Sequence, residues 1–183
     1  GVVSIIPFKF KEFLEKHGFY KYTPEGSTNY IFIVIKSNII DNTTDDLIKD
    51  YVLKYLIELE DLSIYNHFAE RTKYFKEDFL SLLSYKKIYF IENSEFESYL
   101  YFKNLALRVT KEKLEKINYD SLDGFVWKEQ VINREFEYCD DNNCDYSQFI
   151  TNISNKNQTR VKSVESTIGF LLQGHKEECN NRW

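Results

Sequence analysis

The sequence predicts an α+β fold, in which antiparallel β-hairpins pack against helices and the chain ends in helices. Three observations support this class. Helical spacing and period-two patterns come in separate blocks rather than in alternation, which disfavours a parallel, doubly wound sheet. Turn residues separate pairs of β-rich runs. Hydrophobic residues make up 43% of the 183 residues, which is enough for a packed core.

Three stretches of the first half show helical spacing. The first runs over 8–17 and is followed by Gly18, a residue typical of a helix C-cap. The second runs from about 44 to 59, where a threonine hydroxyl precedes two acids. The third runs over 62–83, where an aromatic stripe indicates a surface that faces the core.

Period-two patterns indicate two hairpins. A turn at 24–26 separates 19–22 from a strand over 30–35. Both faces of that strand are apolar, so we expect it to be central and covered on both sides. A turn at 110–113 marks the second hairpin. Its two strands are predicted at 99–109 and 114–117. A shorter strand is predicted before them, at 88–91, and a short apolar segment after them, at 125–127.

The last quarter of the chain is acidic and then helical. Residues 135–145 carry five acids and no Lys or Arg, which is typical of a solvated loop. Two helices follow, one around Ile150 and one around Ile168, and Gly174 closes the second. We therefore expect an α+β region over 1–134, and over 135–183 an acidic loop and a helical pair.

Composition and motifs exclude several kinds of protein. The net charge of −5 argues against a dedicated nucleic-acid coat. No apolar run approaches the roughly 20 residues of a membrane-spanning helix. Three cysteines are too few for a disulfide framework and fit a reducing compartment, so we expect a soluble cytoplasmic protein. The patterns GxxxxGK[ST] and GxSxG are absent, and neither a cofactor nor a catalytic residue is expected.

A zinc site is the sharpest local alternative. Three cysteines and one histidine can bind zinc tetrahedrally, and the chain offers Cys139, Cys144, His175 and Cys179. Neither pair has CxxC spacing, and two predicted helices separate the pairs. Unligated thiols are the simpler interpretation, so no metal ligand is assigned.

Several runs resemble one family. The run Tyr101–Leu114, YFKNLALRVTKEKL, is similar to a hairpin that precedes the motor of phage- and poxvirus-type primase–helicases. The run Ser166–Gly174, STIGFLLQG, looks like the helix directly before the Walker-type core of superfamily-3 helicases. FKEFLEKHGFY and NYIF, near the N-terminus, resemble primase–helicases of gut Bacteroidetes phages and mobile elements. Asn104-Leu105 departs from the Asn-Gly of that family.

The resemblance implies a role in mobile-element DNA replication. The chain begins with Gly1 and has no Met, so we expect a piece of a longer protein whose helicase motor lies beyond the helical pair. The resemblance does not imply that this piece hydrolyses ATP.

DNA contact is expected from two basic stretches, one on the second hairpin and one in the tail. Their cations are Lys103, Arg108, Lys111, Lys113, Arg160 and Lys162. Tyrosines beside the hairpin, such as Tyr99, provide rings on which bases stack. An ordinary solvated hairpin explains the same charges, and the negative net charge favours that simpler interpretation.

The sequence thus predicts a non-catalytic N-terminal region of a mobile-element replicative primase–helicase. It would position single-stranded or forked DNA, or organise the helicase oligomer. Its expected partners are DNA, the motor of the same parent chain and further copies of itself. The alternative is a protein-interaction module without DNA binding, which uses the acidic loop and aromatic faces. An enzyme with an unrecognised site is a third class, and no motif supports it.

Overall fold

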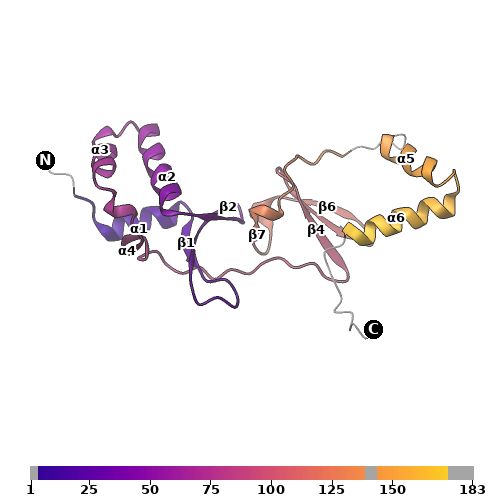
Figure 1. Ribbon diagram of the computed structural model, residues 1–183, viewed down its shortest axis with the longest axis horizontal. Coiled ribbons are helices and arrows are strands. Elements are labelled where there is room, and N and C mark those ends of the chain that lie inside the picture. Colours follow the sequence, from indigo (N-terminus) through magenta and orange to yellow (C-terminus); the bar gives the residue numbers. More distant parts are fainter. Residues whose placement is uncertain (1–3, 139–143, 173–183) are drawn as a thin grey trace. The chain divides into compact units, whose positions relative to one another are not determined.

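The computed structural model describes residues 4–138 and 144–172. Helices occur together with mainly antiparallel strands, which confirms the predicted α+β class (Figure 1). The chain divides into two compact units. The first is made of Gly1–Phe90 and Leu122–Glu129, and the second of Ile91–Ser121 and Gln130–Trp183. The domain boundary expected at residue 134 stays a prediction.

The first unit contains helix α1 (Pro7–Lys16) and a four-stranded sheet. Pro7 suits the first turn of a helix, where its missing N–H is not needed. Gly18 follows the helix with a φ of +88°, which confirms the predicted helix end. The sheet has the order β1-β2-β3-β7, with strands β1 (Phe19–Tyr22), β2 (Ile31–Lys36), β3 (Ile39–Thr43) and β7 (Val126–Trp127).

Strand β2 is central, as predicted. It pairs with β1 and β3 in antiparallel fashion, while β7 lies parallel to β3. Its burial is uneven: Ile33 is fully buried, whereas Phe32 and Val34, on the other face, are partly buried against the helical core. The apolar segment predicted at 125–127 therefore completes a sheet that begins about a hundred residues earlier.

Further helices of the first unit are α2 (Asp45–Glu58), α3 (Leu62–Glu70), the 3₁₀ helix η1 (Thr72–Phe75) and α4 (Glu77–Leu80). The expectation of one helix over 62–83 is wrong. The backbone leaves the helical region at Arg71 (φ −121°, ψ 70°) and at Lys76 (φ −77°, ψ 153°). Each break gives the following segment a new direction.

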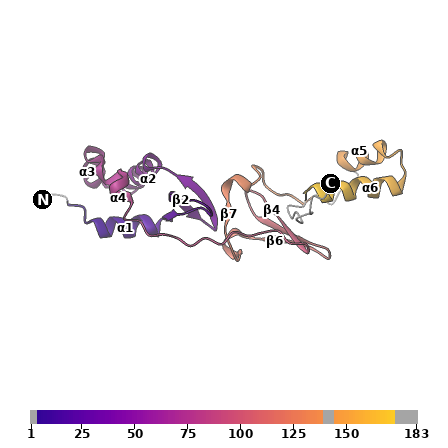
Figure 2. The same cartoon turned by 60° about the horizontal axis from the view of Figure 1, so that its bottom comes forward.

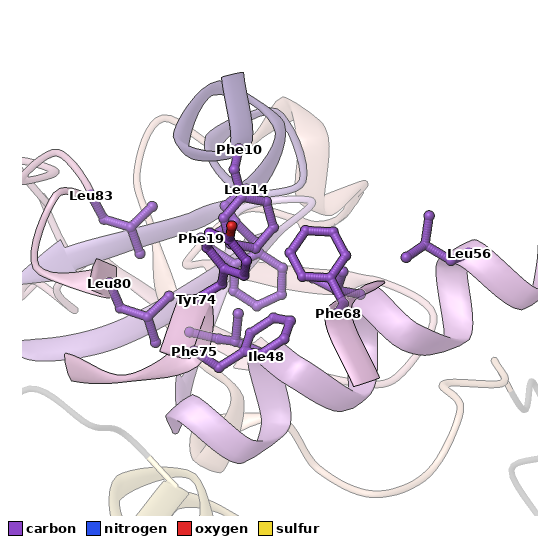
Figure 3. Close-up of a cluster of buried hydrophobic side chains, with 11 residues drawn as sticks. Phe10, Leu14, Phe19, Ile48, Leu56, Phe68, Tyr74, Phe75, Leu80 and Leu83 are labelled. Atoms are coloured by element: carbon purple, nitrogen blue, oxygen red, sulfur yellow. The ribbon is translucent and has the colours of Figure 1, made fainter. Parts of the chain in front are cut away.

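The breaks let aromatic rings from several segments gather in one core (Figure 3). Phe10 of α1 lies with its ring centroid 4.9 Å from that of Phe68 and 5.9 Å from that of Phe75. Tyr74 joins the same group at 6.4 Å. A straight helix would point these side chains along one stripe, whereas the bent chain wraps them around Phe10.

The second unit contains a three-stranded antiparallel sheet, β4 (Glu97–Tyr101), β5 (Ala106–Thr110) and β6 (Leu114–Ile117). The single strand predicted over 99–109 is wrong, because the chain reverses between Phe102 and Leu105. The backbone N–H of Phe102 donates to the carbonyl of Leu105 at 2.8 Å. The return strand over 114–117 is confirmed. The strand predicted at 88–91 is reduced to one bridge, between Phe90 and Phe125.

Two helices, α5 (Asp145–Ile153) and α6 (Gln158–Leu172), form a helical hairpin (Figure 2). The turn between them is made by Asn155 and Lys156, with φ of 51° and 57°. The helical end is confirmed, while its predicted closing residue, Gly174, lies outside the described residues. Short 3₁₀ turns, η2 (Tyr119–Ser121) and η3 (Lys128–Gln130), complete the elements. Within 4–138 and 144–172, no helix has the length and apolar character needed to cross a membrane.

Candidate functional site

The β4–β6 sheet carries the hairpin residues that the sequence singles out. Alternation along the strands places Tyr99, Arg108 and Glu115 on one face, in register across the three strands. Leu100 and Leu107 belong to the opposite face, and Leu107 is buried. Around these positions one face of the sheet is polar and the other is mostly apolar, although Lys116 pairs with Leu107 on the second face.

Arg108, a predicted DNA contact, lies between two acids. Its Nε and Nη2 are 2.7 and 2.5 Å from Oε2 of Glu97, and its Nη1 is 3.6 Å from Oε2 of Glu115. The hydrogen bond to Glu97 raises the pKa of Arg108. The two carboxylates hold the guanidinium, so Arg108 is the least available of the predicted cations for a phosphate.

Lys111 and Lys113 lie at the β5–β6 turn. The ammonium of Lys113 is paired with the carboxylate of Glu115, and this hydrogen bond outweighs desolvation to lower the pKa of Glu115. Lys111 is exposed and borders a groove of about 370 Å³ that also touches Leu172 of α6. Positive charge at this end of the sheet is thus partly neutralised.

Lys103 lies at the other end of the sheet, in the β4–β5 turn. The five residues of β5 separate the two turns by about 17 Å, at about 3.4 Å per residue. The predicted basic hairpin is therefore not one patch. Its cations fall at two ends, with the ion-paired Arg108 between them.

Asn104 joins this turn to a distant segment. Its Nδ2 donates to the carbonyl of Phe136 at 3.2 Å, and its Oδ1 accepts from the N–H of Phe136 at 2.9 Å. The N–H of Lys103 also donates to the carbonyl of Arg134, at 3.0 Å. The chain keeps the Asn of the Asn-Gly pattern at position 104, where its side-chain amide forms these two hydrogen bonds, and departs from the pattern only at Leu105.

The docked segment brings cations and rings together around the turn. The ring centroids of Phe102 and Phe136 are 5.3 Å apart. Lys116 Nζ lies 5.5 Å from the centroid of Phe136, and the Arg134 guanidinium carbon lies 5.7 Å from that of Phe102. We call Phe102, Lys103, Lys116, Arg134 and Phe136 the Phe136 cluster. Phe102 is buried, while Phe136 is partly exposed.

Lys116 belongs to the basic second hairpin, whereas no pattern in the sequence assigns Arg134 or Phe136 to a site. Arg134 and Phe136 are adjacent to the acidic residues of 135–145, where the local charge is negative. The pairing with Asn104 is the feature that turns them toward Lys103. No local spacing reveals a hydrogen bond between residues 32 positions apart.

Two tyrosines close to Phe102, Tyr101 and Tyr119, are buried. The hydroxyl of Tyr119 donates to the carbonyl of Phe102 at 2.6 Å, and burial raises the pKa of Tyr119 to about 12. Burial also raises the pKa of Tyr101. Both hydroxyls therefore stay protonated at neutral pH, and Tyr119 holds the backbone of the turn in place.

The two predicted cations of the tail lie on α6. Arg160 and Lys162 are exposed near the start of that helix. Leu172, at the far end, is the residue that borders the sheet groove with Lys111. Twelve residues of helix separate Arg160 from Leu172, which is about 18 Å. Arg160 and Lys162 are not gathered with the hairpin cations, and their contact with DNA stays a prediction.

The cysteine and histidine set considered for zinc falls mostly outside the described residues, which exclude Cys139, His175 and Cys179. Cys144 is described, and its Sγ lies 3.3 Å from Oγ of Ser147. Among 4–138 and 144–172, no three side chains of His, Cys, Asp or Glu come together as a metal ion would require.

No family model matches the chain, and comparison with curated proteins and with solved structures finds no match either.

Proposed function

We propose that the chain is a non-catalytic region of a mobile-element primase–helicase and that it positions single-stranded DNA on the Phe136 cluster. The observation that carries this proposal is the docking of residues 134–136 on the β4–β5 turn, which brings Lys116 to the partly exposed ring of Phe136 and Arg134 to the ring of Phe102. The resemblance of 101–114 and 166–174 to primase–helicases supplies the biological setting, including a cytoplasmic location.

The cluster has the chemistry that single-stranded nucleic acid requires. Cations follow the phosphates, and an aromatic ring stacks on a base whatever its identity. Lys103 is exposed and forms no ion pair with a described residue. Phe136 presents its ring between Lys116 and the turn.

The first prediction concerns DNA affinity. Fluorescence anisotropy with labelled single-stranded DNA is expected to show binding that weakens as salt increases. The double change Lys103→Gln and Lys116→Gln should reduce the log–log salt slope by about 0.7 for each phosphate that is no longer neutralised. Phe136→Ala should cost about 1–3 kcal/mol of binding free energy, the stacking of one base.

Lys113→Gln is the matched control, because Lys113 lies on the same sheet but is paired with Glu115. It should leave affinity and salt slope close to those of the unmodified chain. Absence of binding at about 50 mM salt would contradict the proposal, and so would equal losses for Lys113→Gln and the cluster variants.

A second candidate is the other role expected above, the organisation of the helicase oligomer, and one observation favours it. Three apolar side chains at helical spacing on α5 remain exposed: Tyr146 (51%), Phe149 (59%) and Ile153 (56%). Ile150, on the adjacent side of the helix, is buried. Exposed apolar stripes of this kind are typical of surfaces that contact another protein. The partner we propose for this function is a second copy of the chain.

The second prediction concerns self-association. Light scattering after size exclusion should give a mass above that of one chain, and Phe149→Asp should reduce it to one chain, because a buried unpaired carboxylate is costly at an interface. Asn152→Asp, an exposed polar position on the same helix, adds the same charge and should leave the mass unchanged. A single-chain mass for the unmodified protein contradicts self-association.

A further inference from the structure

The first unit contains a polar cavity of about 420 Å³ at the end of α1. Its walls come from segments far apart in the sequence: the end of α1, β1, the β2–β3 turn, α2 and residue 86. Besides Glu15, the polar residues that line it are Lys16, His17, Tyr20, Asn38, Tyr51 and Lys86. None of them belongs to the Phe136 cluster, so the inference does not rest on the proposed function.

Backbone geometry fixes the position of the cavity. Gly18 has a φ of +88°, and a Cβ at this position would lie 2.2 Å from the carbonyl oxygen of Ile35. The N–H of Ile35 donates to the carbonyl of Gly18 at 2.9 Å. Only glycine therefore lets α1 end this close to β2. On the other wall, Asn38 Nδ2 donates to the carbonyl of Leu122 at 3.1 Å, which holds the β2–β3 turn.

The charges at the cavity favour an anion. Two lysines, Lys16 and Lys86, line the cavity together with one acid, Glu15. This carboxylate already accepts the N–H of Ser84 at 2.8 Å and lies 3.4 Å from Lys11 Nζ. Because Glu15 is neutralised by Lys11, positive charge from Lys16 and Lys86 is left for a ligand.

The end of α1 carries a partial negative charge that opposes an anion. His17 weakens this effect. Its backbone N–H lies 3.2 and 3.0 Å from the carbonyls of Phe13 and Leu14, and its Nδ1 lies 2.7 Å from the Phe13 carbonyl. A carbonyl only accepts, so Nδ1 carries the proton and donates it. The Nδ1 proton is thus already used within α1, and His17 lines the cavity with the rest of its ring.

Aromatic rings provide the rest of the wall. Lys86 Nζ lies 5.2 Å from the ring centroid of Tyr20, so a cation and a ring are adjacent at the cavity. Burial is the main cause that raises the pKa of Tyr20 and of Tyr51. The charge of Glu15 raises the pKa of Tyr20 further, and Tyr55 and Glu58 do the same for Tyr51. Both hydroxyls are therefore protonated at neutral pH and are available as donors.

We propose that this cavity binds a small phosphate monoester of the nucleotide class. Two ammonium groups and tyrosine hydroxyls suit a phosphate dianion, and the tyrosine rings suit a planar base. The volume lies within the range of small-molecule sites, about 300–1,000 Å³, and is larger than inorganic phosphate needs. The site has no glycine-rich phosphate loop and is built from side chains instead.

The third prediction tests this site by calorimetric titration of the full chain with adenosine monophosphate, inorganic phosphate and adenosine. The monophosphate should bind, and adenosine should bind at least about tenfold more weakly. Lys86→Gln should weaken monophosphate binding about tenfold. The matched control is Lys87→Gln, because Lys87 is the next residue, is exposed and lies 4.9 Å from the ring of Tyr89, outside the cavity.

A second readout locates the ligand. The imidazole proton signals of His17 should shift on titration with the monophosphate, and those of His67, which is buried in the helical core, should not. The inference is overturned by failure of the monophosphate to bind at about 1 mM, by equal losses in Lys86→Gln and Lys87→Gln, or by adenosine binding as tightly as its monophosphate.

Discussion

Glu15 connects α1 to the chain that follows α4. Its Oε1 accepts the backbone N–H of Ser84 at 2.8 Å, and its side chain is only 20% exposed. Burial acts to raise the pKa of this carboxyl, but the hydrogen bond from Ser84 and the ammonium of Lys11 outweigh it, so the pKa lies below its ordinary value of 4.5. The ionised form therefore stabilises the folded state.

The fourth prediction follows from that shift. A carboxylate with a lowered pKa contributes stability that is complete above pH 4.5 and is lost as the pH falls through the lowered value. Glu15→Gln should reduce the free energy of unfolding by about 1–2 kcal/mol at neutral pH, and this difference should shrink in acid. Urea unfolding at several pH values measures it.

Glu12→Gln is the control for that measurement. Glu12 lies on the same helix and pairs with Lys9 at 2.7 Å, but both side chains are exposed. An exposed pair contributes little, so the change in unfolding free energy should stay below about 0.5 kcal/mol at every pH. A difference for Glu15→Gln that persists unchanged in acid would contradict the assigned role of its charge.

Lys21 is a lysine that the fold buries. It lies in a β-strand among tyrosines, yet it is 7% exposed. Its ammonium donates to the carbonyl of Ser81 and lies 5.0 and 4.3 Å from the rings of Tyr30 and Tyr85. Burial lowers the pKa of Lys21. The ammonium of Lys21 thus joins the end of α4 to the sheet.

At the scale of elements, two segments that were predicted to be continuous are interrupted, for related reasons. Apolar residues continue at helical spacing across 62–83, and several of them, such as Phe68, Phe75 and Leu83, face the core on both sides of the backbone breaks at Arg71 and Lys76. Periodicity records which residues are buried and not the direction of the backbone. Similarly, β-forming residues continue through 99–109, and the reversal at Lys103 and Asn104 contains neither Gly nor Pro to mark it.

Other elements were predictable because their signals are local. Thr44 caps α2, and its Oγ1 accepts the N–H of Leu47 at 3.3 Å. Gly18 ends α1, and the 24–26 turn joins β1 to β2. In each case, one residue or a short run meets a backbone requirement that exists before any tertiary contact.

At the scale of the whole molecule, the two units are interleaved along the chain. The segment Leu122–Glu129 belongs to the first unit, although residues on either side of it belong to the second. It supplies β7, where Val126 is 1% exposed and pairs with Ile39 of β3. The first unit is therefore incomplete until the chain has passed through all three strands of the second sheet.

The fifth prediction tests this interleaving in the intact chain. Val126→Ala should lower the unfolding free energy of the first unit by about 1–2 kcal/mol, because it removes buried methyl groups. Hydrogen exchange should speed up at the amides of β2, around Ile33, and remain slow in β5. Val109→Ala, in β5, is the reciprocal control. Faster exchange in β5 alone after Val126→Ala would contradict the division.

The sequence by itself determined the α+β class, the helical end, the first hairpin and the absence of recognisable catalytic motifs. It also predicted DNA contacts at Lys103, Arg108, Lys111, Lys113, Arg160 and Lys162, and these stay predictions. Only the tertiary structure separated Lys103 from Lys111 and Lys113, paired Arg108 with two acids, and brought Arg134 and Phe136 to Asn104. The physical reason is one of range. Caps, turns and periodicity act within a few residues, whereas charge pairing and hydrogen bonds between distant segments exist only after the chain has folded.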